Sequence, residues 1–393
     1  MSVAPPPSLP DRLRSLDALR GFDMFWIIGG DYLGRAVGKW YYGTEHNWLA
    51  EQLEHVTWEG FRFYDLIFPL FLFLVGTVIP FSLASLRRRG ASNAAIYLRI
   101  ARRVVLLFAL GLLANGVMQL KWLVHTDDGR WAVDLNNHLR ITGVLQRIAI
   151  CYGIAAVISL HTDWRGQLLT IVTILLGYWA LLAWVPNPDS GVAGDFTMEG
   201  NLGGWVDRHF LPGRLNPNYY GDGKSIAYGD NEGLLSTIPA VATALLGVLV
   251  GQWLRSAAPP SRKTAALAIA GAACLAVGEV WGHWFPIIKN LWTSSYVLVA
   301  AGWSLLLLSL FYGIVDGLKW QAWAFPLVVI GVNAITIYVG QRFLGFPLMT
   351  DFFLGGVIRE AGAFGPVVKW AGVLGFEWLF LYWLYRQRLF LRV

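Results

Sequence analysis

The sequence has few charged residues and almost no cysteine. Only 14% of its 393 residues are charged, whereas 56% are hydrophobic and 15% are aromatic. A soluble domain cannot bury so much apolar surface in one core, so lipid must be the solvent for most of the chain. The two cysteines, Cys151 and Cys274, both lie within apolar runs. This placement argues against a disulfide framework and against a thiolate metal site.

Several common catalytic motifs are also missing. The sequence contains no HExxH, no CxxC pair, no GxxxxGK[ST] and no GxSxG. Metal-dependent hydrolysis, P-loop hydrolysis and the nucleophile elbow of serine hydrolases therefore lack their residues. We expect no metal at the functional site.

Long apolar runs dominate what is present. A membrane-spanning helix needs about 20 apolar residues to cross roughly 30 Å of hydrocarbon. The runs predict an all-α, polytopic bundle of about ten transmembrane helices, at residues 16–34, 61–86, 96–118, 140–160, 166–185, 232–255, 263–285, 291–315, 322–344 and 366–386.

The basic residues gather in short connections that all fall on one side of this bundle. They are Arg12, Arg14, Arg87, Arg88, Arg89, Arg99, Arg102, Arg103, Arg255, Arg262, Lys263, Arg386, Arg388 and Arg392. The positive-inside rule makes that side cytoplasmic and places both termini there. We attribute most of the net charge of +6 to orientation and a small share to an anionic ligand, and we expect no nucleic acid partner.

The opposite, extracytoplasmic side carries the long connections. These loops lie near residues 35–60, 119–139 and 186–231, and we treat 1–393 as one transmembrane domain. Long loops rich in turn-forming residues are typical of segments that cover or line a site.

Ionisable and amide side chains within the predicted helices lie mostly toward the extracytoplasmic side. They are Asp31, Asp65, Arg147, Glu232, Glu279, Asn290 and Asn333. Such groups are costly in lipid, so each needs a partner or a water-filled cavity. One interpretation is structural pairing, for instance of Asp65 with Arg147. For the set as a whole we favour a polar cavity.

His55 stands in an extracytoplasmic loop a few residues before a predicted helix. A neutral imidazole can act as a base toward an amine or hydroxyl, or can itself accept an acyl group. His46 lies in the same loop, and loop histidines are more often surface residues than catalysts. The residues alone leave both possibilities open.

Three arginines, Arg99, Arg102 and Arg103, share one helical face on the cytoplasmic side. The simpler interpretation is anchoring to anionic lipid headgroups. The alternative is a phosphate-binding mouth for a nucleotide-bearing donor.

Six blocks of the sequence, taken in order, resemble a known family. They are RLRSLDALRGFDMFWIIGGDYLG, LEHVTWEGFRFYDLIFPLFLFLVG, HLRITGVLQRIAICY, NEGLLSTIPAVATALLGVLVGQWL, KNLWTSSYVLVAAGWSLLLLSLFY and GVNAITIYVG. The family is that of the heparan-α-glucosaminide N-acetyltransferases and their bacterial relatives. The resemblance runs from about Arg12 to the last helix.

The resemblance implies a membrane acyltransferase that takes acetyl from acetyl-CoA on the cytoplasmic side and delivers it to an amino sugar on the other. The family's active-site histidine stands in an H-x-x-W-x-G-x-x-x-x-D-L-x-F-P block, which here contains His55, Trp58 and Asp65. Asp31 replaces an asparagine that family members often show. A carboxylate can orient a histidine, but it donates to an acyl oxygen only when protonated.

From motif and depth together we expect His55, Asp65 and Asp31 to be catalytic and Arg99, Arg102 and Arg103 to bind the donor. The expected substrate-binding residues are Trp58, His138, Arg140, Arg147, Glu232, Asn290 and Asn333. The resemblance further implies a homodimer in lipid, located in the bacterial inner membrane.

Two mechanisms fit these residues: direct transfer with His55 as the base, which we favour, and transfer through an acetylated His55. Competing functions are a sugar or cation transporter, or an O-acetyltransferase acting on a cell-envelope glycan. A transporter should place its binding groups near the midplane, usually with inverted repeats. The sequence shows no such repeat, and its polar residues lie toward one rim.

Overall fold

The computed structural model describes residues 13–121, 123–125, 131–134, 138–216, 220–224 and 226–390. The prediction of an all-α fold is confirmed, since the one sheet described is a hairpin of two three-residue strands. In chain order the elements are α1 (Arg14–Phe25), η1 (Trp26–Gly30), α2 (Asp31–Tyr42), α3 (Trp48–Gln52), η2 (Phe63–Leu66), α4 (Ile67–Arg88), α5 (Asn93–Ala114), η3 (Val117–Gln119), β1 (Leu123–His125), β2 (Trp131–Val133), α7 (Val144–His161), α8 (Trp164–Trp184), α9 (Leu202–Phe210), α10 (Leu234–Leu254), α11 (Pro260–Gly282), α12 (Ser294–Phe311), η4 (Tyr312–Gly317), α13 (Phe325–Val332), α14 (Ala334–Leu344), α15 (Phe346–Glu360), η5 (Gly362–Phe364) and α16 (Gly365–Arg386).

Seven helices in the described part of the chain are long and apolar enough to cross a membrane. They are Phe63–Arg88, Val144–His161, Trp164–Trp184, Leu234–Leu254, Pro260–Gly282, Ser294–Gly317 and Gly362–Arg386. The pair α13 and α14 adds an eighth if it counts as one span, although it bends by 75° at the break. Eight of the ten predicted segments therefore have a counterpart by length and composition.

The other two predicted segments, 16–34 and 96–118, contain α1 and α5. A π-helical turn with Gly29 at φ 139° interrupts the first, so that α1 and α2 are two short helices. The second forms the single 22-residue helix α5, which carries three arginines.

Small residues bring the backbones of neighbouring helices close together. A Cβ added to Gly76 of α4 would lie 2.0 Å from the carbonyl oxygen of Ala244 in α10, and one on Gly247 would lie 2.1 Å from that of Phe73. Packing of this kind is common between transmembrane helices, because lipid provides no hydrophobic drive for their association. The span that contains α4 is the most buried of the seven. Of its most apolar stretch 78% is buried inside the protein, against 17% for the span formed by α11.

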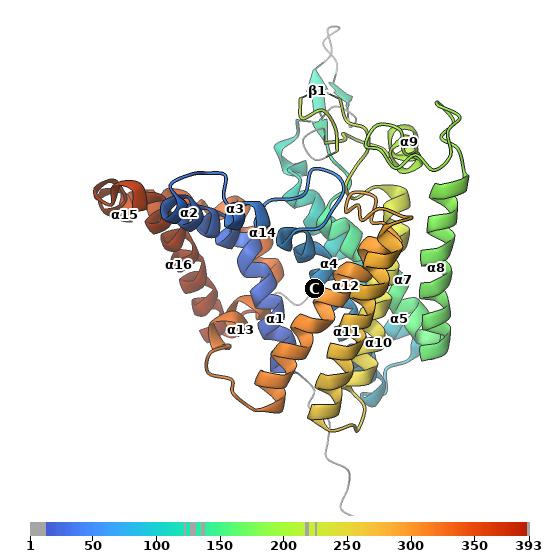
Figure 1. The fold of residues 1–393 in the computed structure, drawn as a ribbon. Coiled ribbons are helices and arrows are strands. Elements are labelled where there is room, and N and C mark those ends of the chain that lie inside the picture. Colours follow the sequence, from blue (N-terminus) through green and yellow to red (C-terminus); the bar gives the residue numbers. More distant parts are fainter. Residues whose placement is uncertain are drawn as a thin grey trace, which may run out of the picture.

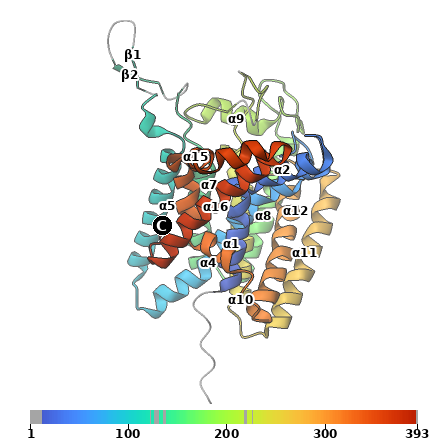
Figure 2. The same ribbon diagram turned by 90° about the vertical axis from the view of Figure 1, so that its left-hand side faces the viewer.

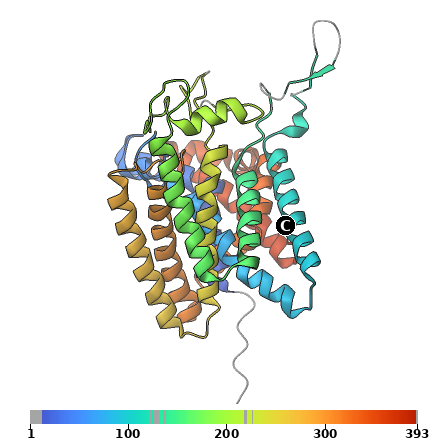
Figure 3. The same cartoon turned by 90° about the vertical axis from the view of Figure 1, so that its right-hand side faces the viewer.

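The long connections gather at one end of the bundle. α2, α3, α9 and the β1–β2 hairpin all lie there, above the vertical helices (Figures 1 and 2). The turns that join α4 to α5 and α10 to α11 lie at the opposite end (Figure 3). We call the first the loop end and the second the basic end, after the arginines of those turns. The loops and the basic turns thus separate as the sequence predicted.

Candidate functional site

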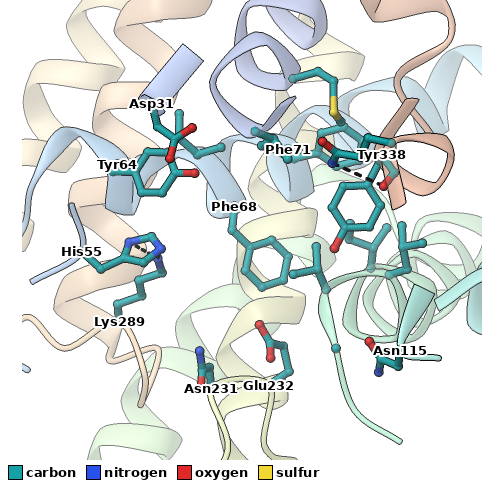
Figure 4. A pocket seen from close by; sticks show the side chains of 18 of the residues that line it. Asp31, His55, Tyr64, Phe68, Phe71, Asn115, Asn231, Glu232, Lys289 and Tyr338 are labelled. Atoms are coloured by element: carbon teal, nitrogen blue, oxygen red, sulfur yellow. Dashed lines mark hydrogen bonds between the residues drawn. The ribbon is translucent and has the colours of Figure 1, made fainter. Parts of the chain in front are cut away.

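A cavity of about 610 Å³ opens between the helices and contains His55 in its lining. Its walls come from η1, α2, α4, α7 and α14 together with the loops before η2, α10 and α12. Figure 4 shows His55, Lys289 and Tyr64 on one side and Glu232, Asn231 and Asn115 on another, with the ring of Phe68 between them. The lining therefore combines aromatic surface with polar groups, as ligand sites usually do.

Asp65 fixes the position of His55. In the 3₁₀ turn η2, Asp65 Oδ2 accepts hydrogen bonds from the backbone N–H of Arg62 at 3.1 Å and of Val56 at 3.3 Å. Its other oxygen, Oδ1, lies 2.9 Å from His55 Nδ1. Because the Asp65 side chain is only 1% exposed, the carboxylate is held rigidly. The imidazole itself is 39% exposed and faces the cavity.

Lys289 is the third member of this cluster, although it is far away in the sequence. The backbone N–H of Gly60 donates to the carbonyl of Ile287 at 2.8 Å, and Glu59 forms a β-bridge with Ile288. This pairing brings Lys289 Nζ to 2.8 Å from His55 Nδ1 and 3.3 Å from Asp65 Oδ1.

The electrostatics of the cluster favour a neutral imidazole. Burial and the neighbouring charge of Lys289 lower the pKa of His55, while Asp65 acts in the opposite direction. Burial lowers the pKa of Lys289, and Asp65 again opposes the shift. When the neutral imidazole carries its proton on Nδ1 and donates it to Asp65, the basic lone pair is on Nε2, and Lys289 Nζ lies 3.2 Å from that nitrogen.

Asp31 also lines the cavity, but it does not hold His55. It is the first residue of α2, and its Oδ2 accepts a hydrogen bond from Arg35 Nη2 at 2.8 Å. Its Oδ1 is buried and has no hydrogen-bond partner among the described residues. Asp31 therefore offers a carboxylate oxygen in the wall of the cavity.

Arg140 and Glu232, both predicted substrate-binding residues, meet in the cavity wall. Arg140 donates to both carboxylate oxygens of Asp230, at 2.7 and 3.0 Å, and to Glu232 Oε2 at 2.5 Å. The two carboxylates hold the pKa of Arg140 well above its ordinary value, despite its burial. Glu232, one member of this ion network, lies across the cavity from His55 (Figure 4).

Arg147 does not line the cavity. It lies behind the indole of Trp292, with its guanidinium carbon 4.9 Å from the ring centroid, and it donates to Ser236 Oγ at 2.5 Å. The suggested structural pair of Asp65 with Arg147 is wrong, since Asp65 pairs with His55 and Lys289 instead. Arg147 thus contacts the start of α10, whereas Val144, Leu145 and Ile148 of the same helix line the cavity.

Four other predicted residues lie outside the cavity lining. Trp58 donates to the carbonyl of Phe196 at 2.8 Å and joins two loops. His138 Nε2 lies 3.7 Å from Asp134 Oδ2 near the hairpin. Asn290 follows Lys289, whereas Asn333 is 2% exposed at the break between α13 and α14, where neither of its side-chain polar atoms has a described partner.

The predicted donor-binding arginines are also absent from the lining. Arg99, Arg102 and Arg103 lie on α5, and the Arg103 guanidinium stacks over the ring of Tyr152 at 4.4 Å. Within the described ranges no three His, Cys, Asp or Glu side chains gather closely enough to hold a metal ion.

Sequence reasoning missed Lys289, Tyr338 and Arg342, which all line the cavity. Lys289 opens the KNLWTSS block and stands directly beside Asn290, which was predicted instead. A charge directly before a predicted helix is the one signal in the sequence that could have drawn attention to Lys289.

Comparisons with known proteins support the family indicated by the sequence blocks. A family described as "Domain of unknown function (DUF5009)" matches residues 12–186. Heparan-alpha-glucosaminide N-acetyltransferase of Homo sapiens is 29% identical over 85% of this chain and 53% of its own length. The Mus musculus protein of the same name is 28% identical over 86% and 54%. The chain thus spans about half the length of the curated relatives it matches.

Proposed function

We propose that this protein is a transmembrane acetyltransferase, which moves acetyl from cytoplasmic acetyl-CoA to the amine of a glucosamine-type sugar on the extracytoplasmic side. The observation that carries the proposal is the pairing of His55 with Asp65 at the wall of a cavity of about 610 Å³ within a helix bundle. The names of the human and mouse relatives, which specify N-acetyl transfer to a glucosaminide, support it.

His55 acts as the general base in the direct route. Its Nε2 takes a proton from the acceptor nitrogen as that nitrogen forms its bond to the thioester carbonyl carbon, and the carbon–sulfur bond then breaks. The proton on His55 passes to the departing sulfur, so the imidazole returns to its neutral form. Asp65 holds the ring and stabilises its protonated form, as the carboxylate does in other histidine-based sites.

The residues of the cavity suit both substrates. Phe68 and Phe71 offer apolar surface to an acyl-pantetheine arm, and Asn115 and Asn231 can bond its amides. The carboxylate oxygen of Asp31 and the Glu232 network suit a polar, amine-bearing acceptor. Arg99, Arg102 and Arg103 remain the proposed holders of the nucleotide end, although they lie outside this lining.

In a second route His55 is itself acetylated, and the amine then attacks the acyl-imidazole. Mass spectrometry of protein incubated with acetyl-CoA alone distinguishes the two routes. An acetyl group on His55 supports the two-step route, whereas its absence in protein that completes transfer supports the direct route, which we favour.

One observation favours a different function. Asn333 lies buried at a 75° break between α13 and α14, and broken helices carry the binding sites of many transporters. Uptake of labelled glucosamine without acetyl-CoA would indicate transport. An O-acetylated cell-envelope glycan is the other alternative, and the position of the acetyl group in the product identifies it.

The test uses sealed inside-out vesicles that contain glucosamine, with labelled acetyl-CoA added outside. Wild type should form N-acetylglucosamine inside the vesicles, and His55→Ala should lower the rate by about 10²–10⁴-fold, as expected for loss of a general base. His46→Ala is the matched control, because this histidine lies in the same loop but not in the cavity lining. If wild type forms no product, or if His55→Ala is as active as His46→Ala, the proposal fails.

The same proposal includes a bacterial inner-membrane location and a homodimer. Cross-linking of the full chain in its native membrane measures the second of these directly.

A further inference from the structure

A second cavity, of about 360 Å³, lies at the basic end of the bundle. It is enclosed by the start of α1, the middle of α4, the end of α10, the start of α11 and the turn η4. None of its lining residues belongs to the cavity around His55. Nothing in the proposed acetyl transfer uses this space.

Cations outnumber carboxylates in its lining. Arg14, Arg255, Lys263 and Lys319 are basic and only Asp316 is acidic, so four positive charges face one negative charge. In the described part of the chain no salt bridge joins Asp316 to these cations, and Asp316 Oδ2 accepts the backbone N–H of Ser15 at 3.1 Å. The cavity therefore has an excess of positive charge that the described side chains do not neutralise.

Lys263 distinguishes this cavity from ordinary positive-inside anchoring. Its side chain is turned inward, since the residue is only 5% exposed and Nζ donates to the carbonyl of Leu254 at 2.7 Å. The neighbouring Arg262 is exposed, so it can contribute to membrane orientation by the positive-inside rule without the cost of burying a charge. Burying an ammonium is costly unless its remaining N–H groups find acceptors, and two remain after the bond to Leu254.

We propose that this cavity binds a phosphate-bearing anion, with the phosphate oxygens between Lys263 and Arg255. Phosphate offers several acceptors and negative charge, which match guanidinium and ammonium donors. Leu13, Phe81 and Leu254 line the same space and suit an apolar part attached to the phosphate. Both an anionic phospholipid headgroup and a free phosphate have this chemistry.

The test titrates the purified full chain, in a detergent with a neutral headgroup, with short-chain phosphatidylglycerol, phosphatidylcholine or inorganic phosphate. Native mass spectrometry and the rise in unfolding temperature measure binding. Lys263→Met and Arg255→Gln should each weaken binding about tenfold, since each removes a charge-assisted hydrogen bond. Arg262→Gln, which removes one charge from the same helix outside the cavity, should change binding less than about twofold.

Each outcome decides the matter. Binding of phosphatidylglycerol alone, with this variant pattern, identifies a lipid headgroup, and the same pattern with inorganic phosphate identifies a free phosphate. If no probe binds, or if Arg262→Gln weakens binding as much as Lys263→Met, the proposal is overturned. If Lys263→Met does not fold, Arg255→Gln and Lys319→Gln provide the comparison. The test measures no acetyl transfer, so its result is independent of the proposed function.

Discussion

Replacing Lys289 by methionine should change the pH dependence of acetyl transfer. The ammonium of Lys289 lies 2.8 Å from His55 Nδ1, where it opposes a positive charge on the imidazole and so lowers the pKa of His55. Methionine keeps much of the apolar chain and removes the charge. The pKa of His55 should therefore rise in Lys289→Met, and less of the basic imidazole is present at acidic pH.

The magnitude follows from Coulomb's law. Because the His55 side chain is 39% exposed, we use the dielectric constant of bulk water, which gives a lower limit for the repulsion energy between the two charges. Two unit charges at the 2.8 Å separation of Lys289 Nζ and His55 Nδ1 then repel by about 1.5 kcal/mol. Because Lys289→Met removes this repulsion, the acidic limb of the kcat/KM profile should move to higher pH.

The assay records kcat/KM against pH for wild type, Lys289→Met and Lys289→Arg with one acceptor, so that titration of the acceptor is common to all three. Lys289→Arg keeps the charge, and its acidic limb should stay near that of wild type. If the limb of Lys289→Met does not move, or moves to lower pH, the electrostatic reasoning is refuted. A lower rate at every pH with an unmoved limb would indicate a purely structural role.

Three further predictions concern other parts of the structure. Asp65→Asn removes the anion that raises the pKa of His55, so the acidic limb should move to lower pH while the maximal rate falls; an upward shift contradicts this. Arg140→Met leaves Asp230 and Glu232 without their cation and should lower the free energy of unfolding by about 3 kcal/mol or more. Denaturant unfolding in detergent measures this loss, and an unchanged unfolding midpoint contradicts the prediction. Gly76→Ala places a Cβ 2.0 Å from the carbonyl oxygen of Ala244 and should cost about 1–3 kcal/mol, whereas Gly375→Ala, with open space around it, is the control that should unfold like wild type.

Hydropathy located the helices well but not their interruptions. Eight of the ten predicted segments coincide with helices or a helix pair able to span a membrane. Two interruptions, at Gly29 and Asn333, depend on backbone conformation: φ is 139° at Gly29, and the helix axis turns by 75° beside Asn333. The apolar runs on either side of such a position have the same composition as one continuous helix, so hydropathy does not detect the interruption.

The candidate site was predictable where a motif specified it. His55 and Asp65 come from one short block, and they meet because the chain turns between them. Arg147 was misplaced because depth along a helix does not determine rotation about its axis. Lys289 was missed because its position depends on backbone pairing of Gly60 with Ile287, which leaves no signature in the side chains.

Because that pairing joins distant parts of the chain, the cluster around His55 is completed late in synthesis. His55 and Asp65 leave the ribosome early, but Lys289 follows His55 by 234 residues, and Tyr296, which donates to the backbone carbonyl of Asp65 at 2.8 Å, comes later still. The region matched by the domain of unknown function ends at residue 186, before either of them. A nascent chain of that length carries a histidine and a carboxylate but not the cation beside them. The contacts of His55 and Asp65 with Lys289 and Tyr296 can form only after the start of α12 has been synthesised.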